Sequence, residues 1–370
     1  MATNPSKAPP SARHEKPNRL LPESSLSVTV AAMSQTSLAG ILPSQSLDAL
    51  IASGAIGSAS AFDADQVQPA SLDLRLGARC WRIRASFLPG LGRTVRQRMA
   101  DVAMHEIDLT KGAVLERGCV YIAEIQEHLA LAQGVSARGN PKSSTGRIDV
   151  FVRLMTDYSR AFDDVAAGYT GPLYIEIAPQ TFSILARTGT RLNQLRLKQG
   201  KPALLETRSV GVDLTGDLAG FRARRHCGVI DLDKVGSHDP HDFWEALEPR
   251  KGELLLDPGE FYILASKEAV DIPVMQAAEM TPIDPSVGEF RVHYAGFFDP
   301  GFGTVEGGGL GSRGVLEVRS HETPFLLEDG QTVARLVYEP LIAMPDRLYG
   351  TGGSHYQKQG LKLSKHFGNW

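Results

Sequence analysis

Cysteine is scarce in this chain of 370 residues, and its three cysteines are too scattered for a disulfide scaffold or a Cys-x-x-Cys metal site. They are Cys80, Cys119 and Cys227. Such sparse usage predicts a reducing, cytoplasmic compartment. Long hydrophobic runs are missing as well, because none approaches the ~20 residues that a membrane-spanning helix needs. A short apolar stretch near the N-terminus is broken by serines, unlike a secretion signal. We therefore expect no membrane anchor.

Neither sign of charge dominates. The chain has 39 basic and 42 acidic residues, a formal net charge of −3. The absence of a broad basic field argues against a protein that binds duplex nucleic acid along its backbone, so any anion must be bound locally. Length and a 42% hydrophobic content suit two ordinary domains. Residues 1–40, rich in Pro and Ser at their start, are expected to form a flexible arm.

Helical periodicity is confined to one short stretch. Apolar residues recur at helical spacing from Leu42 to Ile51, with Pro43 and Ser44 at the start and Gly54 just beyond. These signals predict a short amphipathic helix. Beyond it, apolar or alternating runs of a few residues lie between Gly, Pro and Asp, which predicts strands. We expect a mainly β protein with a few short helices.

The predicted strands occur twice at an offset of 140 or 141 positions. Leu72-Asp73-Leu74 returns as Val212-Asp213-Leu214, 140 positions later, and Glu176 corresponds to Glu317, 141 positions later. A constant offset indicates two copies of one structural unit. Two copies are too few for a solenoid, so we interpret them as a fused pair from an ancestral oligomer.

The repeat predicts the domain organisation. We expect one β domain over residues 41–200 and a second over residues 201–345. A C-terminal tail, residues 346–370, contains glycines together with Tyr, Gln and Lys. Such a tail could close over a ligand, or it could be an ordinary frayed terminus.

One motif occurs in the first copy alone, the heptapeptide Pro-Lys-Ser-Ser-Thr-Gly-Arg at residues 141–147. Two hydroxyls beside a lysine, with an arginine one helical turn further on, can present charge-assisted donors to a polyphosphate. The alternative is a polar loop that caps a helix, with Ser144 as the N-cap. The corresponding residues of the second copy, 281–288, contain no lysine or arginine. The copies have therefore diverged at this loop.

Glu176 and Glu317 lie within apolar β runs. If either side chain shares a buried face with its neighbours, desolvation raises its pKa, which suits a base that works near neutral pH. The alternative is a glutamate on the solvent face of a strand.

In order along the chain, these motifs resemble those of the dCTP deaminase family. The resemblance is carried by Gln-Pro-Ala-Ser-Leu-Asp-Leu-Arg-Leu-Gly at 68–77, the 142–147 loop, Asp299-Pro300-Gly301, Val315-Leu316-Glu317 and the tail. That family shares a jelly-roll-like β fold with dUTPase. The resemblance thus implies two tandem dUTPase-like jelly-roll or β-barrel domains with a few short helices.

The resemblance also implies a reaction, the hydrolysis of dCTP to dUTP and ammonia, which supplies dUTP for thymidylate synthesis. A glutamate, Glu317 or Glu176, would act as general base and acid. The remaining implied roles divide among the loop, the hairpin and the tail. Implied catalytic residues besides the glutamates are Ser143, Arg147 and Ala295, the last through its carbonyl; implied substrate-binding residues are Lys142, Ser143, Ser144, Arg147, Asp299, Tyr349, Tyr356 and Gln359.

The same resemblance implies Mg²⁺ carried on the triphosphate, dTTP as a feedback inhibitor and a homo-oligomer. Zinc is not expected, because the His-x-Glu and Pro-Cys-x-x-Cys motifs of zinc deaminases are absent from the sequence. We therefore expect no metal at the reacting carbon.

Some residues depart from the family pattern. Lys142 stands where the family has arginine, Gly296 and Phe297 replace a His-Arg pair, and residues 304–313 lengthen the hairpin. These departures leave open which glutamate is catalytic. We prefer Glu317, because the loop of the first copy and the hairpin of the second could together build one site.

Two other functions fit the sequence. One is dUTPase activity, alone or joined to deamination, with Asp73 as the base. The other is nucleotide binding without catalysis, in a regulator.

Overall fold

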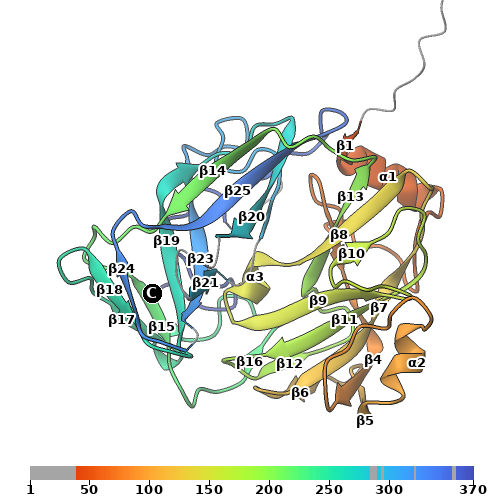
Figure 1. Cartoon of the computed structure of the whole chain (residues 1–370), viewed down its shortest axis with the longest axis horizontal. Coiled ribbons are helices and arrows are strands. Elements are labelled where there is room, and N and C mark those ends of the chain that lie inside the picture. Colours follow the sequence, from red (N-terminus) through yellow and green to blue (C-terminus); the bar gives the residue numbers. More distant parts are fainter. Residues whose placement is uncertain (1–38, 284–289, 293–295, 321, 352–355) are drawn as a thin grey trace, which may run out of the picture. The chain divides into compact units, whose positions relative to one another are not determined.

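Strands dominate the structure and its helices are short, as the sequence predicts. The computed structural model describes residues 39–283, 290–292, 296–320, 322–351 and 356–370. Within these ranges the helices are α1 (Ser44–Ala52), α2 (Val95–Met99), α3 (Ser143–Gly146) and the 3-10 turn η1 (Pro240–Asp242) (Figure 1). None of these helices is long and apolar enough to span a membrane.

Helix α1 confirms the helix predicted between Leu42 and Gly54. Its start follows Pro43, which has an extended backbone, and Leu47 is fully buried. Gly54 has a φ of 78°, the left-handed conformation that commonly ends a helix. Helix α2 was not predicted, although Thr94 and Gln97 form a capping box at its start.

The first half of the chain supplies three antiparallel groups of strands. Strand order is β1-β13-β8-β10 in one sheet, β5-β4-β7-β11-β9 in a second, and β6 beside β12 in a third. The bounds are β1 (Gly40–Ile41), β2 (Ile56–Ser58), β3 (Leu72–Leu74), β4 (Leu76–Ile83), β5 (Ala103–Asp108), β6 (Ala113–Leu115), β7 (Val120–Ala130), β8 (Val135–Pro141), β9 (Val150–Thr156), β10 (Asp164–Val165), β11 (Thr170–Pro179), β12 (Ile184–Ala186) and β13 (Asn193–Gln199).

The second half repeats this plan with sheets ordered β14-β25-β20-β22, β17-β15-β19-β23-β21 and β18-β24. Strand β16 joins the first half by pairing in parallel with β12. The bounds are β14 (Glu206–Gly211), β15 (Gly220–Ala223), β16 (Ile230–Asp231), β17 (Trp244–Leu247), β18 (Glu253–Leu256), β19 (Phe261–Val270), β20 (Gln276–Pro282), β21 (Phe290–Val292), β22 (Phe297–Phe298), β23 (Ser312–Ser320), β24 (Phe325–Glu328) and β25 (Thr332–Pro340).

Strand pairing follows the sequence repeat. Glu176 on β11 lies opposite Ile122 on β7, and Glu317 on β23 lies opposite Ile263 on β19. Both members of the second pair stand 141 positions after their counterparts. The two glutamates therefore occupy equivalent places in equivalent sheets.

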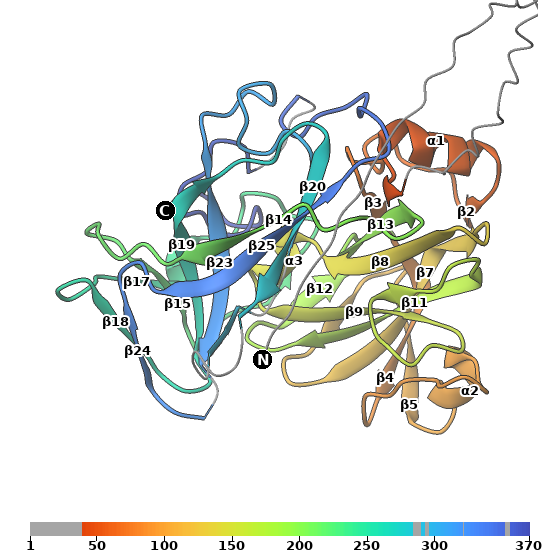
Figure 2. The same cartoon turned by 45° about the horizontal axis from the view of Figure 1, so that its top comes forward.

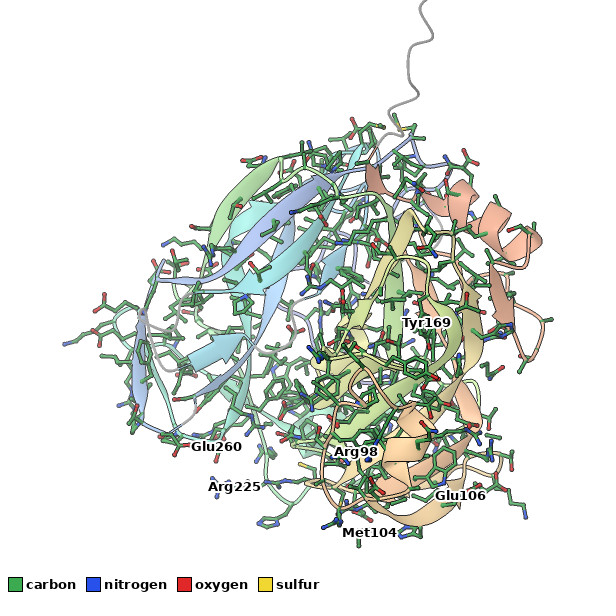
Figure 3. The ribbon with its side chains drawn as sticks, turned by 45° about the vertical axis from the view of Figure 1, so that its right-hand side comes forward. Arg98, Met104, Glu106, Tyr169, Arg225 and Glu260 are labelled. Atoms are coloured by element: carbon green, nitrogen blue, oxygen red, sulfur yellow. The ribbon has the colours of Figure 1, made fainter. Side chains whose placement is uncertain are left out.

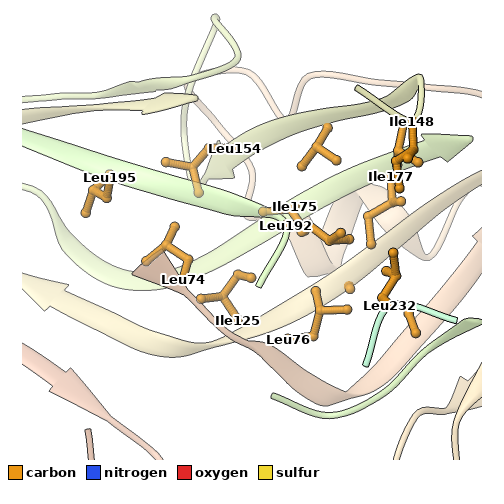
Figure 4. Close-up of a cluster of buried hydrophobic side chains, with 14 of the residues drawn as sticks. Leu74, Leu76, Ile125, Ile148, Leu154, Ile175, Ile177, Leu192, Leu195 and Leu232 are labelled. Carbon is orange, nitrogen blue, oxygen red and sulfur yellow. The ribbon is translucent and has the colours of Figure 1, made fainter. Parts of the chain in front are cut away.

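The largest buried apolar cluster extends across both halves. Leu74, Ile175 and Leu195 pack together in the first half, and Leu232 joins them from the second (Figure 4). Val315, two residues before Glu317, belongs to the same cluster. Burial of each such side chain contributes roughly 1.5–3 kcal/mol to the stability of the fold. Because the cluster contains residues of both halves, the halves share one core. A separate cluster fills the second half.

Polar contacts also join the two halves close to α3, which lies between them (Figure 2). Arg196 on β13 donates to Asp299 at 2.8 Å and to the Ala278 carbonyl at 2.8 Å. Asp149, which follows α3, pairs with Arg319 on β23. These contacts hold the loop of the first half against the strand that carries Glu317.

Candidate active site

A cavity of about 620 Å³ lies where the first half, the second half and the tail meet. This volume suits a small-molecule ligand. The residues that line it are mainly polar at the first-half side and partly apolar at the second-half side. Among them are Asp73, Lys142, Ser143, Ser144, Arg147 and Arg191 from the first half, Asp299, Phe302, Val315 and Glu317 from the second, and Tyr349, Tyr356, Gln359 and Lys365 from the tail.

The 141–147 loop folds as a single helical turn. Lys142 occupies the N-cap position, since its carbonyl accepts from Thr145 at 2.8 Å and Gly146 at 3.0 Å. The turn begins two residues before Ser144, so the N-cap predicted at Ser144 is wrong. Ser144 is buried inside the turn instead, and its carbonyl accepts a hydrogen bond from the Ser364 hydroxyl at 2.8 Å. The tail is thereby tied to the loop.

Arg147 is buried and surrounded by the tail. It donates to the Lys362 carbonyl at 2.9 Å and to the Gln359 side chain at 3.0 Å. Its guanidinium lies 4.0 Å from the centre of the Tyr356 ring, a stacking contact that favours arginine over lysine. Its Nε lies 4.0 Å from Oε1 of Glu317, too far for a direct hydrogen bond. A small polar group between them would be within reach of both.

Glu317 is 4% exposed and sits beside Val315 on the face of β23 that lines the cavity. Burial raises the pKa of this carboxyl to about 8, and the nearby Arg147 opposes the rise. A carboxyl with such a pKa can both accept and return a proton near neutral pH.

Glu176 has a different environment at the equivalent position. Its Oε1 accepts from Nε of Arg153 at 3.0 Å, and the Arg153 guanidinium stacks 3.6 Å from the centre of the Phe162 ring. Glu176 does not line the cavity. The structure therefore brings Glu317, and not Glu176, together with the 141–147 loop.

The face of β11 that carries Glu176 is covered by residues 84–102, which include α2. Phe87, Val95 and Met99 from this segment pack with Tyr174, two residues before Glu176. On the outer side of this cover, near α2, lie the polar residues Arg98 and Glu106 (Figure 3). In the second half, the equivalent face packs against the first half.

Arg191 lines the same cavity and was not predicted. It contacts three carboxylates, Asp63 at 2.7 Å, Asp65 at 2.8 Å and Asp73 at 3.5 Å, and Asp73 also pairs with Lys142. A sequence signal existed, because the position 141 residues after Arg191 is Thr332. The two copies thus differ in charge here as they do at the loop.

The tail places three predicted side chains on the cavity. Tyr349 packs against Phe302 at 5.4 Å between ring centres. Tyr356 and Gln359 contact Arg147, as described above. Gly350 has a φ of 102°, and a Cβ there would lie 2.1 Å from the Gly307 carbonyl, so only glycine fits where the tail crosses the hairpin.

The other predicted residues have mixed placements. Asp299 lines the cavity, but its carboxylate is engaged by Arg196 and by Ser71 at 3.2 Å. Ala295 lies outside the described residues. Lys365, which faces the cavity from the tail, was missed, and no periodicity or spacing in the sequence marks it.

Comparisons with known proteins agree on one family. Residues 38–201 match the model of the N-terminal domain of 2'-deoxycytidine 5'-triphosphate deaminase, and residues 186–367 match the model of its C-terminal domain. The chain is also similar to the crystal structure of 2'-deoxycytidine 5'-triphosphate deaminase from Agrobacterium tumefaciens. The TM-score is 0.79 and the identity 53%, over 82% of this chain and 99% of that one. The chain belongs to the dCTP deaminase family. The predicted membership is confirmed, and the chain is a dCTP deaminase.

More distant dCTP deaminases match part of the chain. A protein from Beutenbergia cavernae is 28% identical over 156 residues, 42% of this chain and 77% of that protein. One from Halobacterium salinarum is 33% identical over 114 residues, 29% of this chain and 53% of that protein. Both are named "dCTP deaminase, dUMP-forming". The family comparison therefore leaves two products, dUTP and dUMP.

Proposed function

We propose that this dCTP deaminase converts dCTP and water to dUTP and ammonia at a single site built from both halves of the chain. The observation that carries the proposal is the approach of Arg147, from the first-half loop, to within 4.0 Å of Glu317, from the second-half hairpin, in a cavity large enough for a nucleotide. In this proposal the loop side receives the phosphates and Glu317 receives the pyrimidine.

Glu317 acts first as the base. It takes a proton from water while the water oxygen forms a bond to C4 of the pyrimidine. As the water oxygen adds, the electron pair of the C4=N3 bond moves to N3. The protonated carboxyl then gives its proton to the 4-amino nitrogen, the electron pair on N3 re-forms the C4=N3 bond, the C4–N bond to the amino group breaks and ammonia leaves. Transfer of the remaining hydroxyl proton to N3 gives the uracil ring of dUTP. Both steps suit a group whose pKa is about 8, because neither protonation state is strongly disfavoured near neutral pH.

Arg147 and its neighbours position the reacting groups. The buried guanidinium stabilises the ionised form of Glu317. Ser143 and the Ala295 carbonyl would orient the water, while Lys142 and Ser144 would bind phosphate oxygens. Tyr349, Tyr356, Gln359 and Asp299 would enclose the nucleotide.

Mg²⁺ would be carried on the triphosphate, where it neutralises phosphate charge. The carboxylates at this side of the cavity, Asp65 and Asp73, are both engaged by Arg191. These two carboxylates are thus already engaged, which fits an ion held mainly by the nucleotide.

Formation of dUMP is the second candidate, favoured by the names of the curated relatives. It requires attack on phosphorus, for which Asp73 was the predicted base. Asp73 is paired with Lys142 and Arg191, so two cations already engage its carboxylate. This pairing supports dUTP as the product.

The architecture and assembly complete the proposal. The two domains, residues 41–200 and 201–345, each have a dUTPase-like jelly-roll topology, followed by a tail over residues 346–370. Chains form homo-oligomers, and dTTP acts as a feedback inhibitor.

One experiment tests both the reaction and its base. The protein is incubated with dCTP, and ammonia and pyrophosphate are measured separately. We expect ammonia without pyrophosphate. Glu317→Gln should lower the rate of ammonia release by ~10³-fold or more, because it removes the proton carrier, while Glu176→Gln should retain most of it.

The matched glutamates make the outcome decisive. Loss of activity in Glu176→Gln with a folded protein, and its retention in Glu317→Gln, would contradict the site. Equal amounts of ammonia and pyrophosphate would instead identify dUMP as the product.

A further inference from the structure

Lys365 is a half-buried lysine on the tail that faces the cavity. Its ammonium group forms no ion pair within 4.0 Å and donates no side-chain hydrogen bond among the described residues. Lys142 and Arg191, the other cations nearby, already have carboxylate partners. Lys365 is therefore the cation whose charge is least satisfied on this side of the cavity.

The environment of Lys365 favours a bound anion. Burial lowers the pKa of its ammonium group, and the positive charges of Lys142 and Arg191 lower it further, against the attraction of Asp73 and Asp65. A partly desolvated ammonium group among other cations is stabilised when a multivalent anion binds beside it.

The position of Lys365 is fixed by its backbone. Its N–H donates to the Tyr356 hydroxyl at 3.2 Å, and its carbonyl accepts from Gly236 at 2.9 Å. The preceding residue, Ser364, bonds to the carbonyl of Ser144 in the 141–147 loop. The side chain thus starts next to the loop, and the charges that act on it are those around Lys142 rather than Glu317.

We propose that Lys365 binds the outer phosphates of the substrate and is the residue by which this site prefers a nucleoside triphosphate to a monophosphate. The inference rests on the proposed function, because it assumes that the pyrimidine lies at Glu317. A monophosphate held at the other end of the cavity would stop short of Lys365.

Steady-state kinetics with dCTP and dCMP test this assignment. Lys365→Met keeps the length of the side chain and removes its charge. We expect the KM for dCTP to rise about 10- to 100-fold, as for one lost hydrogen bond to a charged group. The kcat for dCTP should change by less than about twofold, and kcat/KM for dCMP should not change.

Two further variants control for position and charge. Lys358→Met removes an exposed tail lysine that does not line the cavity, and should match the wild type. Lys365→Arg should recover most of the affinity for dCTP. An equal loss with dCTP and dCMP, or no loss with either, would overturn the proposal.

Calorimetry with inorganic tripolyphosphate separates this inference from the reaction. Wild-type protein should bind tripolyphosphate about 10-fold or more tightly than Lys365→Met, with both folded. Lys365-dependent binding without ammonia release from dCTP would support the anion site and remove the proposed function. The opposite result is ammonia release from dCTP with a KM and a tripolyphosphate affinity that Lys365→Met leaves unchanged. That result would support the proposed function and overturn the anion site.

Discussion

At the scale of single residues, Glu317 and Glu176 show how neighbours decide the chemistry of a side chain. Both were predicted from their equivalent places in the repeat, and both are buried. Arg153, which neutralises Glu176, lies on β9 opposite it. That partnership depends on the register between strands about 20 residues apart, which local sequence patterns do not specify. The position 141 residues after Arg153 lies outside the described residues.

The raised pKa of Glu317 makes activity depend on pH. The base must be ionised in the free enzyme, so kcat/KM for dCTP should rise with pH and level off above an apparent pKa of about 8. Initial rates of ammonia release between about pH 6 and pH 10, roughly two units on each side of that value, check this. An inflection near the ordinary glutamate pKa would show that a different group limits the rate.

The same shift makes stability depend on pH, with a defined sign. Between the ordinary value of 4.5 and about 8, the folded protein holds a proton on Glu317 that the unfolded chain has lost. Stability therefore falls as pH rises through this window. Glu317→Gln should raise Tm above pH 8 and leave it nearly unchanged near pH 5, as differential scanning calorimetry would show. Glu176→Gln should lower Tm at both values, since it leaves Arg153 without its partner.

At the scale of elements, the regular strands and α1 could be predicted because their signals are local. The loop at 141–147 was predicted for the same reason, although its N-cap was misplaced. The cover formed by residues 84–102 could not be predicted, because its apolar residues follow no strand or helix period. Only the capping box at Thr94 and Gln97 was available as a signal.

The tail is an element whose position depends on its last residues. Phe367 is 5% exposed and packs against Phe243 and Trp244, with ring centres 5.3 Å and 5.9 Å apart. Loss of a buried phenylalanine costs about 3–5 kcal/mol. Phe367→Ala should therefore loosen the tail, raise the KM for dCTP and expose the tail to proteolysis.

Trp370 provides the matched comparison for the tail. It is 45% exposed and stacks on His241 at 4.2 Å. Trp370→Ala should have a smaller effect on KM and on the rate of tail cleavage measured by mass spectrometry. Equal KM values in wild type and Phe367→Ala, with the tail cleaved faster, would show that the tail is not needed to hold the nucleotide.

At the scale of the whole molecule, equivalent positions of the two copies carry opposite charges. Arg138 lies 3.5 Å from Glu279, and Lys198 lies 4.0 Å from Glu339. Each pair joins positions 141 apart in the chain. In two identical copies these positions would carry like charges and repel each other, so the pairs exist only because the copies have diverged. The repeat was predictable from sequence, but this joint was not.

We expect divergence of the two copies to leave one complete nucleotide site among the described residues of each chain. The loop has no counterpart with Lys or Arg in the second copy, Glu176 is held by Arg153, and residues 84–102 cover the face beside it. We therefore expect isothermal titration calorimetry of dCTP with the inactive Glu317→Gln variant to give a stoichiometry of about one nucleotide per chain, as for one intact binding site. The loop, Glu317 and the tail residues of the proposed site line one cavity of a single chain, so we expect specific activity to be constant on dilution. A stoichiometry near two would mean that the equivalent site of the other copy still binds nucleotide. Activity that disappears on dilution would mean that a partner chain completes the site.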